Sequence, residues 1–276
     1  VFYHRGQSKF LISEAMRGEG GRLLNIHGEP FMQNYDAEWG DLAPRDVVAR
    51  SIHQEMLRTN APHVYLDIAS QMPAKEIHER FPNICENCAK FDVDPTTEPI
   101  PVVPAEHYFC GGVWVDEWGH TSLHRLYAAG EVTCSGVHGA NRLGSASLLE
   151  GLVWGYRAAE DIERELAHLE NIDASSIPAW EAAEDDAPAD PALVRHDMAT
   201  IQHTMWYYVG LIRSRRRLER ALRDIGNLRQ DVETFYRQTK LDPAIIRLRD
   251  AVLAALIVAQ AAWENRESHG CHYRID

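Results

Sequence analysis

In the first third of the chain, apolar residues at helical spacing predict one helix. The rest of this region mixes short apolar runs with glycine and proline, which is typical of an α+β region. The helix is predicted from Pro44 or Arg45 to about Thr59. Proline suits the first helical turn, where its missing N–H costs nothing. A short strand is predicted from Val64 to Ile68. The apolar residues of the helix repeat every four positions and therefore share one face: Val48, Ile52 and Met56.

The pattern changes between residues 110 and 170. Two buried strands are predicted, Gly112 to Asp116 and Leu126 to Ala129, with a turn near Gly119 between them. A helix is predicted from about Ser145 to Leu166. The order in this stretch is therefore strand, Gly-rich loop and helix. Five apolar residues line one stripe of that helix: Leu148, Leu152, Tyr156, Ala159 and Ile162.

The last third of the chain is predicted to be helical. Residues 170–191, acidic and rich in Pro and Ala from Glu181 to Asp190, have no periodicity and are predicted to be a surface linker. Three amphipathic helices follow within residues 192–268, and short loops at Gly210–Ser214 and Lys240–Pro243 make them antiparallel neighbours. The middle helix has a clear apolar face: Leu218, Leu222, Ile225, Val232 and Phe235.

Composition and charge narrow the function classes. The 276 residues are 45% hydrophobic and 25% charged, which is ordinary for a globular protein. A net charge of -13 argues against nucleic acid and anionic membranes as partners, and no apolar run is long enough to cross a bilayer. Five cysteines without framework spacing favour a reducing, cytoplasmic location. The N-terminus lacks Met and a signal sequence, so we expect the chain to begin within a longer protein.

The segment from His138 to Leu148 is the strongest candidate for a binding site. Its small residues let a ligand approach the backbone closely. The helix that begins near Ser145 directs free N–H groups and the positive end of its dipole at such a ligand. Arg142 is placed to bind a carboxylate through two hydrogen bonds. The alternative is an ordinary Gly-rich turn with a solvated arginine.

Two further side chains are candidates. His107 precedes Gly111-Gly112, and an imidazole there can donate a hydrogen bond to an anion near neutral pH. The alternative is a partly buried histidine bonded to a backbone carbonyl. Arg45 begins its helix, where the dipole disfavours a cation, and a residue that breaks a local rule is a candidate for function. The alternative is an exposed arginine paired with Asp41 or Asp46.

Other motifs carry less information. Ser13 and Glu14 precede a Gly-rich turn and form either a polar pocket wall or the start of a helix that ends in Gly. Cys85 and Cys88 lack a second pair of ligands, so we predict no metal or redox role. The basic run Arg213–Arg217 is predicted to be a solvated helix face, or a docking surface for an absent part of the protein. No G-x-G-x-x-G follows a predicted strand, and no G-x-S-x-G occurs.

Taken in order, these segments resemble the succinate dehydrogenase and fumarate reductase flavoprotein superfamily, and most closely its L-aspartate oxidase branch. The resemblance implies an α+β fold. Residues 1–109 would be the capping, substrate-covering domain, 110–177 the returning part of a Rossmann-like FAD domain, and 178–276 the linker and a C-terminal three-helix bundle. The matching motifs cover nearly the whole chain: FLISEAMRGEG at 10–20, LAPRDVVAR at 42–50, PVVPAEHYFCGG at 101–112, LYAAGE at 126–131, HGANRL at 138–143, SLLE at 147–150 and RESHGCH at 266–272.

The resemblance assigns substrate roles to five residues. Arg45 matches the arginine that takes a proton from the substrate. A guanidinium can do so only when it is desolvated beside other cations, since it otherwise stays charged. Arg142 and His107 match groups that bind substrate carboxylates. Ser13 and Glu14 match a Thr-Glu pair that contacts the substrate.

The resemblance also implies FAD, bound without a covalent link. Glu131 matches an acid that contacts the flavin, and Ser147 and Leu148 match residues whose backbone meets the isoalloxazine ring. The N-terminal half of the FAD domain, with its glycine-rich diphosphate site, is then expected to be missing from this chain.

The implied reaction is oxidation of L-aspartate to iminoaspartate, with oxygen or fumarate as acceptor, for NAD biosynthesis. L-aspartate or another C4 dicarboxylate is the implied ligand, and quinolinate synthase an implied partner. One alternative is the flavoprotein subunit of succinate dehydrogenase or fumarate reductase, whose loop is similar at Arg142–Ser145. Cys110 and the short segment after Arg266 favour oxidation of L-aspartate over the succinate dehydrogenase or fumarate reductase activity. A third alternative is a non-catalytic binding or assembly module, and the chain alone is expected to be inactive.

Overall fold

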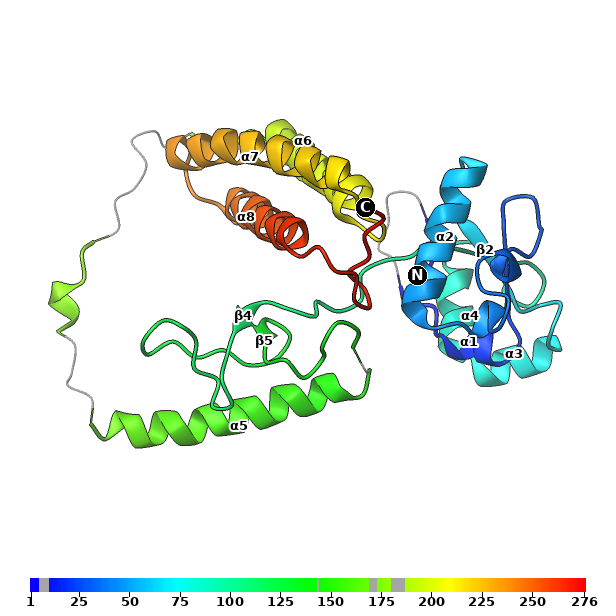
Figure 1. The fold of residues 1–276 in the computed structure, drawn as a ribbon, viewed down its shortest axis with the longest axis horizontal. Helices are drawn as coiled ribbons and strands as arrows, with labels where there is room; N and C mark the ends of the chain where they lie inside the picture. The colour runs from blue at the N-terminus through cyan, green and yellow to red at the C-terminus, as the bar shows by residue number, and fades with distance from the viewer. Residues whose placement is uncertain (5–9, 143, 169–172, 180–186) are drawn as a thin grey trace. The chain divides into compact units, whose positions relative to one another are not determined.

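The computed structural model describes residues 1–4, 10–142, 144–168, 173–179 and 187–276. They form two compact units, Val1–His107 and Tyr108–Asp276 (Figure 1). Helices and small sheets occur together, which confirms the predicted α+β class. None of the helices in these ranges has the length and apolarity needed to cross a membrane. The division into three domains stays a prediction.

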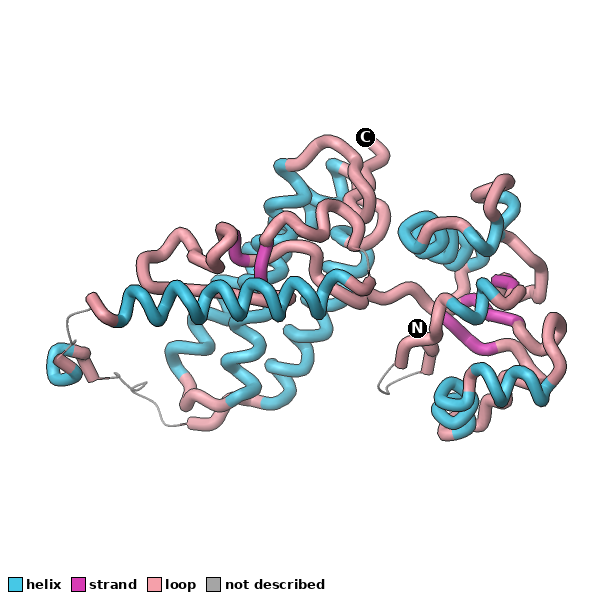
Figure 2. The backbone as a smooth tube through the Cα atoms, turned by 90° about the horizontal axis from the view of Figure 1, so that it is seen from below, coloured by secondary structure: helices cyan, strands magenta, loops and turns pink. Residues whose placement is uncertain are grey.

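The first unit is built on a small antiparallel sheet with the order β1-β2-β3 (Figure 2). Its strands are β1 (Arg22–Leu24), β2 (Val64–Asp67) and β3 (Ile100–Val102). The predicted strand at Val64 is thereby confirmed. Leu23 pairs with Leu66, and Tyr65 pairs with Pro101. The helical elements are α1 (Ala15–Gly18), η1 (Met32–Asn34), η2 (Gly40–Leu42), α2 (Arg45–Thr59), α3 (Ala74–Arg80) and α4 (Pro82–Ala89).

Helix α2 begins and ends where the sequence predicted, and its apolar face packs into the core of the first unit. A buried carboxylate, Glu55, fixes its second half. Glu55 accepts hydrogen bonds from Arg58 at 2.6 and 2.9 Å, from Tyr35 at 2.9 Å and from Asn25 at 3.1 Å. The bond from Arg58 is the main reason that the pKa of Glu55 falls to about 2. The helix that starts with Arg45 is therefore held rigidly at its other end.

The first part of the second unit differs from the prediction. The strand expected from Gly112 to Asp116 is only β4 (Val113–Trp114), whose side chains are exposed, and it pairs in parallel with β5 (Thr133–Cys134). The buried strand expected from Leu126 to Ala129 is wrong. Only Tyr127 forms an isolated bridge, to His120. Parallel strands are usually buried by flanking layers, and in the described residues this pair has no third strand beside it.

Helix α5 (Ala146–Leu166) follows and confirms the predicted helix. Polar side chains bond it to the segment before it. The ring of His120 lies between two carboxylates, 2.8 Å from Asp116 and 2.7 Å from Asp161 of α5. Tyr127 also donates to Asp161, at 2.7 Å. The predicted apolar stripe of α5 is not covered, since Leu148 is 86% exposed.

The rest of the second unit is a helical bundle, as predicted. Its helices are α6 (Pro191–Thr204), which continues as the π-helical turn η4 (Met205–Val209), α7 (Arg215–Gln238) and α8 (Pro243–Glu264). Asp190, Ser214 and Asp242 cap the three α-helices through their side chains. Of the predicted α7 face, Leu218, Ile225 and Val232 are buried, and Leu222 and Phe235 are partly buried. Part of the predicted linker, residues 170–191, lies outside the described residues, and the short 3-10 turn η3 (Ala174–Ser176) lies within its described part.

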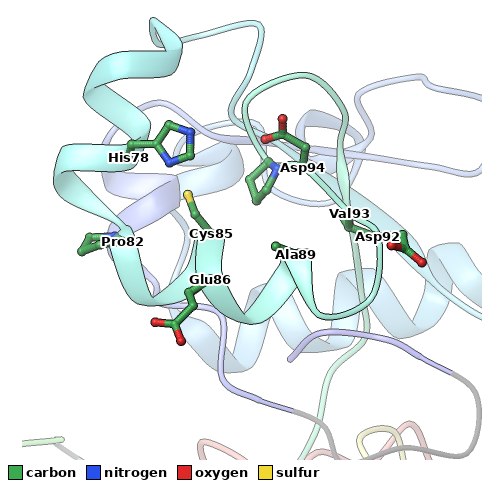
Figure 3. A pocket seen from close by; sticks show the side chains of 9 residues that line it. His78, Pro82, Cys85, Glu86, Ala89, Asp92, Val93 and Asp94 are labelled. Carbon is green, nitrogen blue, oxygen red and sulfur yellow. The ribbon is translucent and has the colours of Figure 1, made fainter.

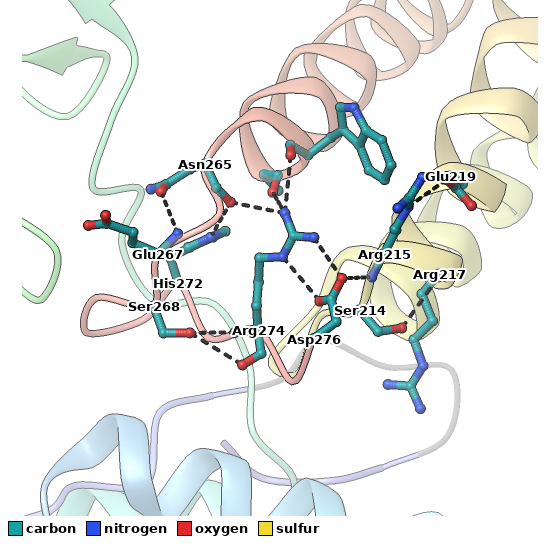
Figure 4. A network of polar contacts seen from close by, with 12 residues as sticks. Ser214, Arg215, Arg217, Glu219, Asn265, Glu267, Ser268, His272, Arg274 and Asp276 are labelled. Carbon is teal, nitrogen blue, oxygen red and sulfur yellow. Dashed lines mark hydrogen bonds and ion pairs between the residues drawn. The ribbon is translucent and has the colours of Figure 1, made fainter.

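The C-terminal segment folds back onto the bundle (Figure 4). The guanidinium of Arg274 donates to Asp276 at 2.9 Å and to the carbonyl oxygens of Trp263 and Asn265 at 3.1 Å. Asp276 in turn accepts from the backbone N–H of Arg215 at 2.8 Å. The prediction of a simple solvated basic face at 213–217 is therefore wrong in part. Arg213 is half-buried and donates to His272 of this segment.

Candidate functional site

Arg142 lies in the loop before α5 and is held by neutral groups. One of its terminal nitrogens donates to the hydroxyl of Ser147 at 2.5 Å and to the carbonyl oxygen of Gly144 at 3.4 Å. Its guanidinium carbon lies 4.3 Å from the centre of the Tyr108 ring, a cation–π contact. In the described residues these contacts leave its positive charge without a paired carboxylate. Such an arginine can accept the carboxylate of a ligand.

A buried carboxylate stands behind this arginine. Glu150 of α5 is 2% exposed and accepts from Tyr108 at 3.0 Å, from His138 at 2.7 Å and from Ser135. Burial raises its pKa, but the bonds from Ser135, His138 and Tyr108 outweigh burial, so the pKa lies below its usual range. Burial, and then the bond to Glu150, raise the pKa of Tyr108. Glu150 therefore stays ionised and Tyr108 stays protonated at neutral pH.

The start of α5 fits a flavin. Its N-cap residue, Ser145, makes no side-chain bond to the first turn. A Cβ atom added at Gly139 or Gly144 would meet no other atom within 4 Å, so both face open space. Reduced flavin carries negative charge at N1 and O2, and the first-turn N–H groups with the helix dipole favour such a charge. Ser147 and Leu148, predicted to contact the cofactor, lie in this first turn.

Glu131, the third predicted cofactor residue, is exposed and follows the turn at Gly130. Its carboxylate accepts from the backbone N–H of Phe109 at 3.1 Å. Nearby, Gly112 has a φ of 137°, and a Cβ atom there would lie 2.0 Å from the carbonyl oxygen of Val132. Only glycine fits this contact. The segment that contains Tyr108 is thus fixed against the strand that precedes the Arg142 loop.

In the first unit, Glu14 brings two arginines together. Arg45, the first residue of α2, forms an ion pair with Glu14 through its Nε, and Arg17 lies 3.3 Å from the other oxygen of Glu14. The Arg45 side chain is 60% exposed, whereas that of Arg17 is mostly buried. Burial lowers the pKa of Arg17 against the opposing effect of Glu14 and Asp41. The predicted alternative partners of Arg45 are wrong, since Asp46 pairs with Arg50 and Asp41 bonds Leu23 and Arg17.

The remaining two predicted residues lie at the edges of the first unit. Ser13 accepts from the backbone N–H of Ala15 at 3.2 Å and so begins the short helix α1. His107 is exposed in the last position of the unit, so the alternative of a partly buried histidine is wrong. The structure thus joins Glu14 to Arg45 in one unit, and Arg142 to Ser147 in the other. Whether all of them form one site stays a prediction.

Two family models match the chain. The FAD binding domain model matches residues 1–148, more than half of the 276 residues. The chain belongs to this FAD-binding family. The C-terminal model of the fumarate reductase flavoproteins matches residues 198–276, which contain most of the helical bundle. Membership of the FAD-binding family agrees with the flavin fit at the start of α5, and the two models together confirm the resemblance that the sequence motifs predicted.

Individual relatives agree with the family. An L-aspartate oxidase from Pseudomonas aeruginosa is 43% identical over 274 residues, which are 99% of this chain and 50% of the relative. A chloroplastic L-aspartate oxidase from Arabidopsis thaliana is 42% identical over 284 residues, with 98% and 43% covered. A solved quinol-fumarate reductase with menaquinol molecules is 30% identical with a TM-score of 0.82, over 96% of this chain and 51% of that one. The chain therefore spans about half the length of the curated relatives it matches.

Four residues of the sequence motifs form contacts that the sequence analysis did not foresee. Arg17, Tyr108, His138 and Glu150 all lie in the matching motifs, yet no role was predicted for them. Their positions in the motifs were the available signal. Their contacts join segments far apart in sequence, such as Tyr108 and Glu150, and these contacts are decided only by folding.

The Cys85–Cys88 pair lies outside this chemistry. Both thiols are buried in α4, and burial raises the pKa of Cys85 and that of Cys88, the latter to about 12. Cys85 lines a pocket of about 550 Å³ together with His78 and Asp94 (Figure 3). In the part of the chain that is described, no group of three or more His, Cys, Asp or Glu side chains could hold a metal ion.

Proposed function

We propose that the full-length protein is an L-aspartate oxidase, an FAD-dependent enzyme that converts L-aspartate to iminoaspartate. The observation that carries this proposal is 43% identity, across 99% of the chain, to a relative of that name. The contacts around Arg142 and Arg45 support it, because a dicarboxylate needs cationic partners. Oxygen or fumarate would accept the electrons, and the product would enter NAD biosynthesis.

Different residues of the chain would bind the substrate and the flavin. Arg142 has neutral partners in the described residues, so its charge is available for one carboxylate of the substrate. His107 is exposed and could donate to a carboxylate, and Ser13 and Glu14 would line the substrate side of the capping region. Glu131, Ser147 and Leu148 would hold the flavin. Bound FAD supplies the acceptor for the hydride of the substrate.

Proton removal is assigned to Arg45. A guanidinium releases its proton only when its neutral form is favoured by desolvation and by nearby cations. Arg17 supplies a cation across Glu14, and Glu14, in contact with both, offers a carboxylate that can pass the proton on. Closure over a substrate would remove water from the exposed side of Arg45. In this scheme Glu14 takes a proton from Arg45 and releases it to solvent, the neutral Arg45 then takes the proton of the substrate, and Arg17 keeps its charge throughout.

Flavin reduction tests the proposal directly. The full-length protein with FAD bound is mixed without oxygen with L-aspartate or succinate, and flavin absorbance is followed. L-aspartate should bleach the flavin and succinate should not. Bleaching by succinate alone would instead make the protein a flavoprotein subunit of the succinate dehydrogenase and fumarate reductase type, which the TM-score of 0.82 to a quinol-fumarate reductase favours as the second candidate.

Two further parts of the proposal need separate measurements. The 276-residue chain alone should be colourless and inactive, because no glycine fingerprint for the FAD diphosphate occurs in it. Turnover by a yellow preparation of this chain would contradict that. Quinolinate synthase is the proposed partner because it would consume iminoaspartate, and co-purification of the two proteins would test this.

A further inference from the structure

Glu150 connects helix α5 to two other segments, one at Tyr108 and one from Ser135 to His138. Its carboxylate is almost fully buried, and it accepts hydrogen bonds from Tyr108, Ser135 and His138. A buried carboxylate is costly unless such donors surround it, and removing its charge leaves those donors unpaired. A residue of this kind fixes the positions of the groups that bond to it.

Tyr108 extends the influence of Glu150 to Arg142. Its hydroxyl lies 3.0 Å from Glu150, and its ring lies 4.3 Å from the guanidinium carbon of Arg142. The edge of the ring also meets His138, with the two ring centres 5.0 Å apart. The other support of Arg142 is Ser147, which lies one helical turn before Glu150 in α5. Helix α5 therefore supports the guanidinium twice, directly through Ser147 and indirectly through the bond of Glu150 to Tyr108.

His138 adds a second buried side chain to this assembly. Its Nε2 is bonded to Glu150, whereas its Nδ1 is buried and has no partner among the described residues. The side chain is only 7% exposed. Buried polar atoms are usually bonded to protein or to ordered water. His138 opens the same loop that holds Arg142, so the unpartnered atom lies where the proposed site requires polar contacts.

We propose that Glu150 is a positioning residue for the carboxylate-binding Arg142. Glu150 fixes the hydroxyl of Tyr108, and the Tyr108 ring keeps the guanidinium of Arg142 oriented for a dicarboxylate. Glu150 itself does not contact the substrate. This inference rests on the proposed function, in which Arg142 binds a substrate carboxylate.

The test compares Glu150→Gln with the wild type in the full-length protein with FAD bound. The amide keeps the shape of the side chain but removes its charge. The Kd for succinate as a dicarboxylate probe, measured from the change in flavin absorbance, should rise about tenfold, and KM for the substrate should rise with it. The kcat should change by less than about threefold, because the proton path of Arg45 is untouched. Glu163→Gln, an exposed position of α5, is the matched control and should change neither.

A double variant separates positioning from general damage. In an Arg142→Lys background, Glu150→Gln should change the Kd by less than about twofold, because the group that it positions is already gone. An equal rise of the Kd in both backgrounds, or an unchanged Kd in the single variant, would overturn the proposal. If Glu150→Gln does not fold, Tyr108→Phe carries the same test, since it removes the hydroxyl and keeps the ring. A wild type that binds no dicarboxylate would refute the proposed function instead.

Discussion

Arg45 and Arg142, one in each unit, have opposite surroundings. Arg45 begins α2 in the first unit, is exposed and is paired with a carboxylate, Glu14, which also contacts Arg17. Arg142 in the second unit is held by a hydroxyl, a carbonyl oxygen and an aromatic ring. A carboxylate neighbour gives an arginine somewhere to pass a proton, whereas neutral neighbours leave its charge free for an anion. The comparison therefore separates a residue suited to proton transfer from one suited to binding.

The largest expected effect is on Arg45. Arg45→Lys in the full-length protein should slow flavin reduction by L-aspartate by about 10³-fold, the usual size of a lost general base. The Kd for the dicarboxylate should change far less, because Arg142 is intact. Stopped-flow absorbance measures the rate, and Arg50→Lys, in the same helix, is the control. A near-normal rate of flavin reduction would show that Arg45 does not take the proton, and its surroundings would then not mark a residue for proton transfer.

Arg142 should show the reverse pattern. Arg142→Lys loses the two-pronged geometry and the stacking on Tyr108, so the Kd for a dicarboxylate should rise by between about tenfold and a hundredfold. The rate of flavin reduction at saturating substrate should fall much less. Equilibrium titration and single-turnover kinetics together give both numbers. A variant with normal affinity but slow reduction would reverse the roles assigned to the two arginines.

The next expected effect is on stability and concerns α5, the helix that supports Arg142. Leu248 of α8 is fully buried, whereas Leu152 of α5 is 69% exposed. Leu248→Ala should lower the free energy of unfolding by about 2–5 kcal/mol. Leu152→Ala should cost less than about 0.5 kcal/mol in this chain alone. In the full-length protein we expect a larger cost, because we propose that the FAD-binding N-terminal segment covers this face. Urea unfolding measures this free energy. An equally small effect of Leu152→Ala in the 276-residue chain and in the full-length protein would contradict that.

The smallest effect concerns the pH dependence of α5 attachment. Hydrogen bonds to Asp116 first, and then to Asp161, raise the pKa of His120, which also faces Tyr127. A raised folded pKa gives stabilisation that is complete below the ordinary value of about 6.5 and is lost as pH rises through the folded value. The melting temperature of the wild type should therefore exceed that of His120→Gln at acidic pH, and the gap should narrow on the alkaline side. A gap that does not depend on pH would show that His120 acts through packing alone.

The apolar faces of α5 and α7 show what could not be predicted from the sequence. The apolar stripes of α5 and of α7, the middle bundle helix, were equally clear in the sequence, and both helices formed where they were predicted. Only the bundle stripes found partners among the described residues. A stripe predicts that a helix has a face to bury, but it does not name the surface that buries it. The wrong strand at Leu126–Ala129 has the same cause, because a strand needs a neighbour to pair with.

The sequence by itself determined the long helices of this protein, its α+β class, its family and the residue types at each candidate position, because periodicity and motif order are properties of neighbouring residues. Only the tertiary structure decided that Glu14 pairs with Arg45, that Tyr108 lies against Arg142 and that Glu150 bonds to Tyr108. These contacts connect residues that are many positions apart. Whether a side chain meets a carboxylate or an aromatic ring depends on how the chain folds back on itself, and that choice sets the charge that each arginine can offer.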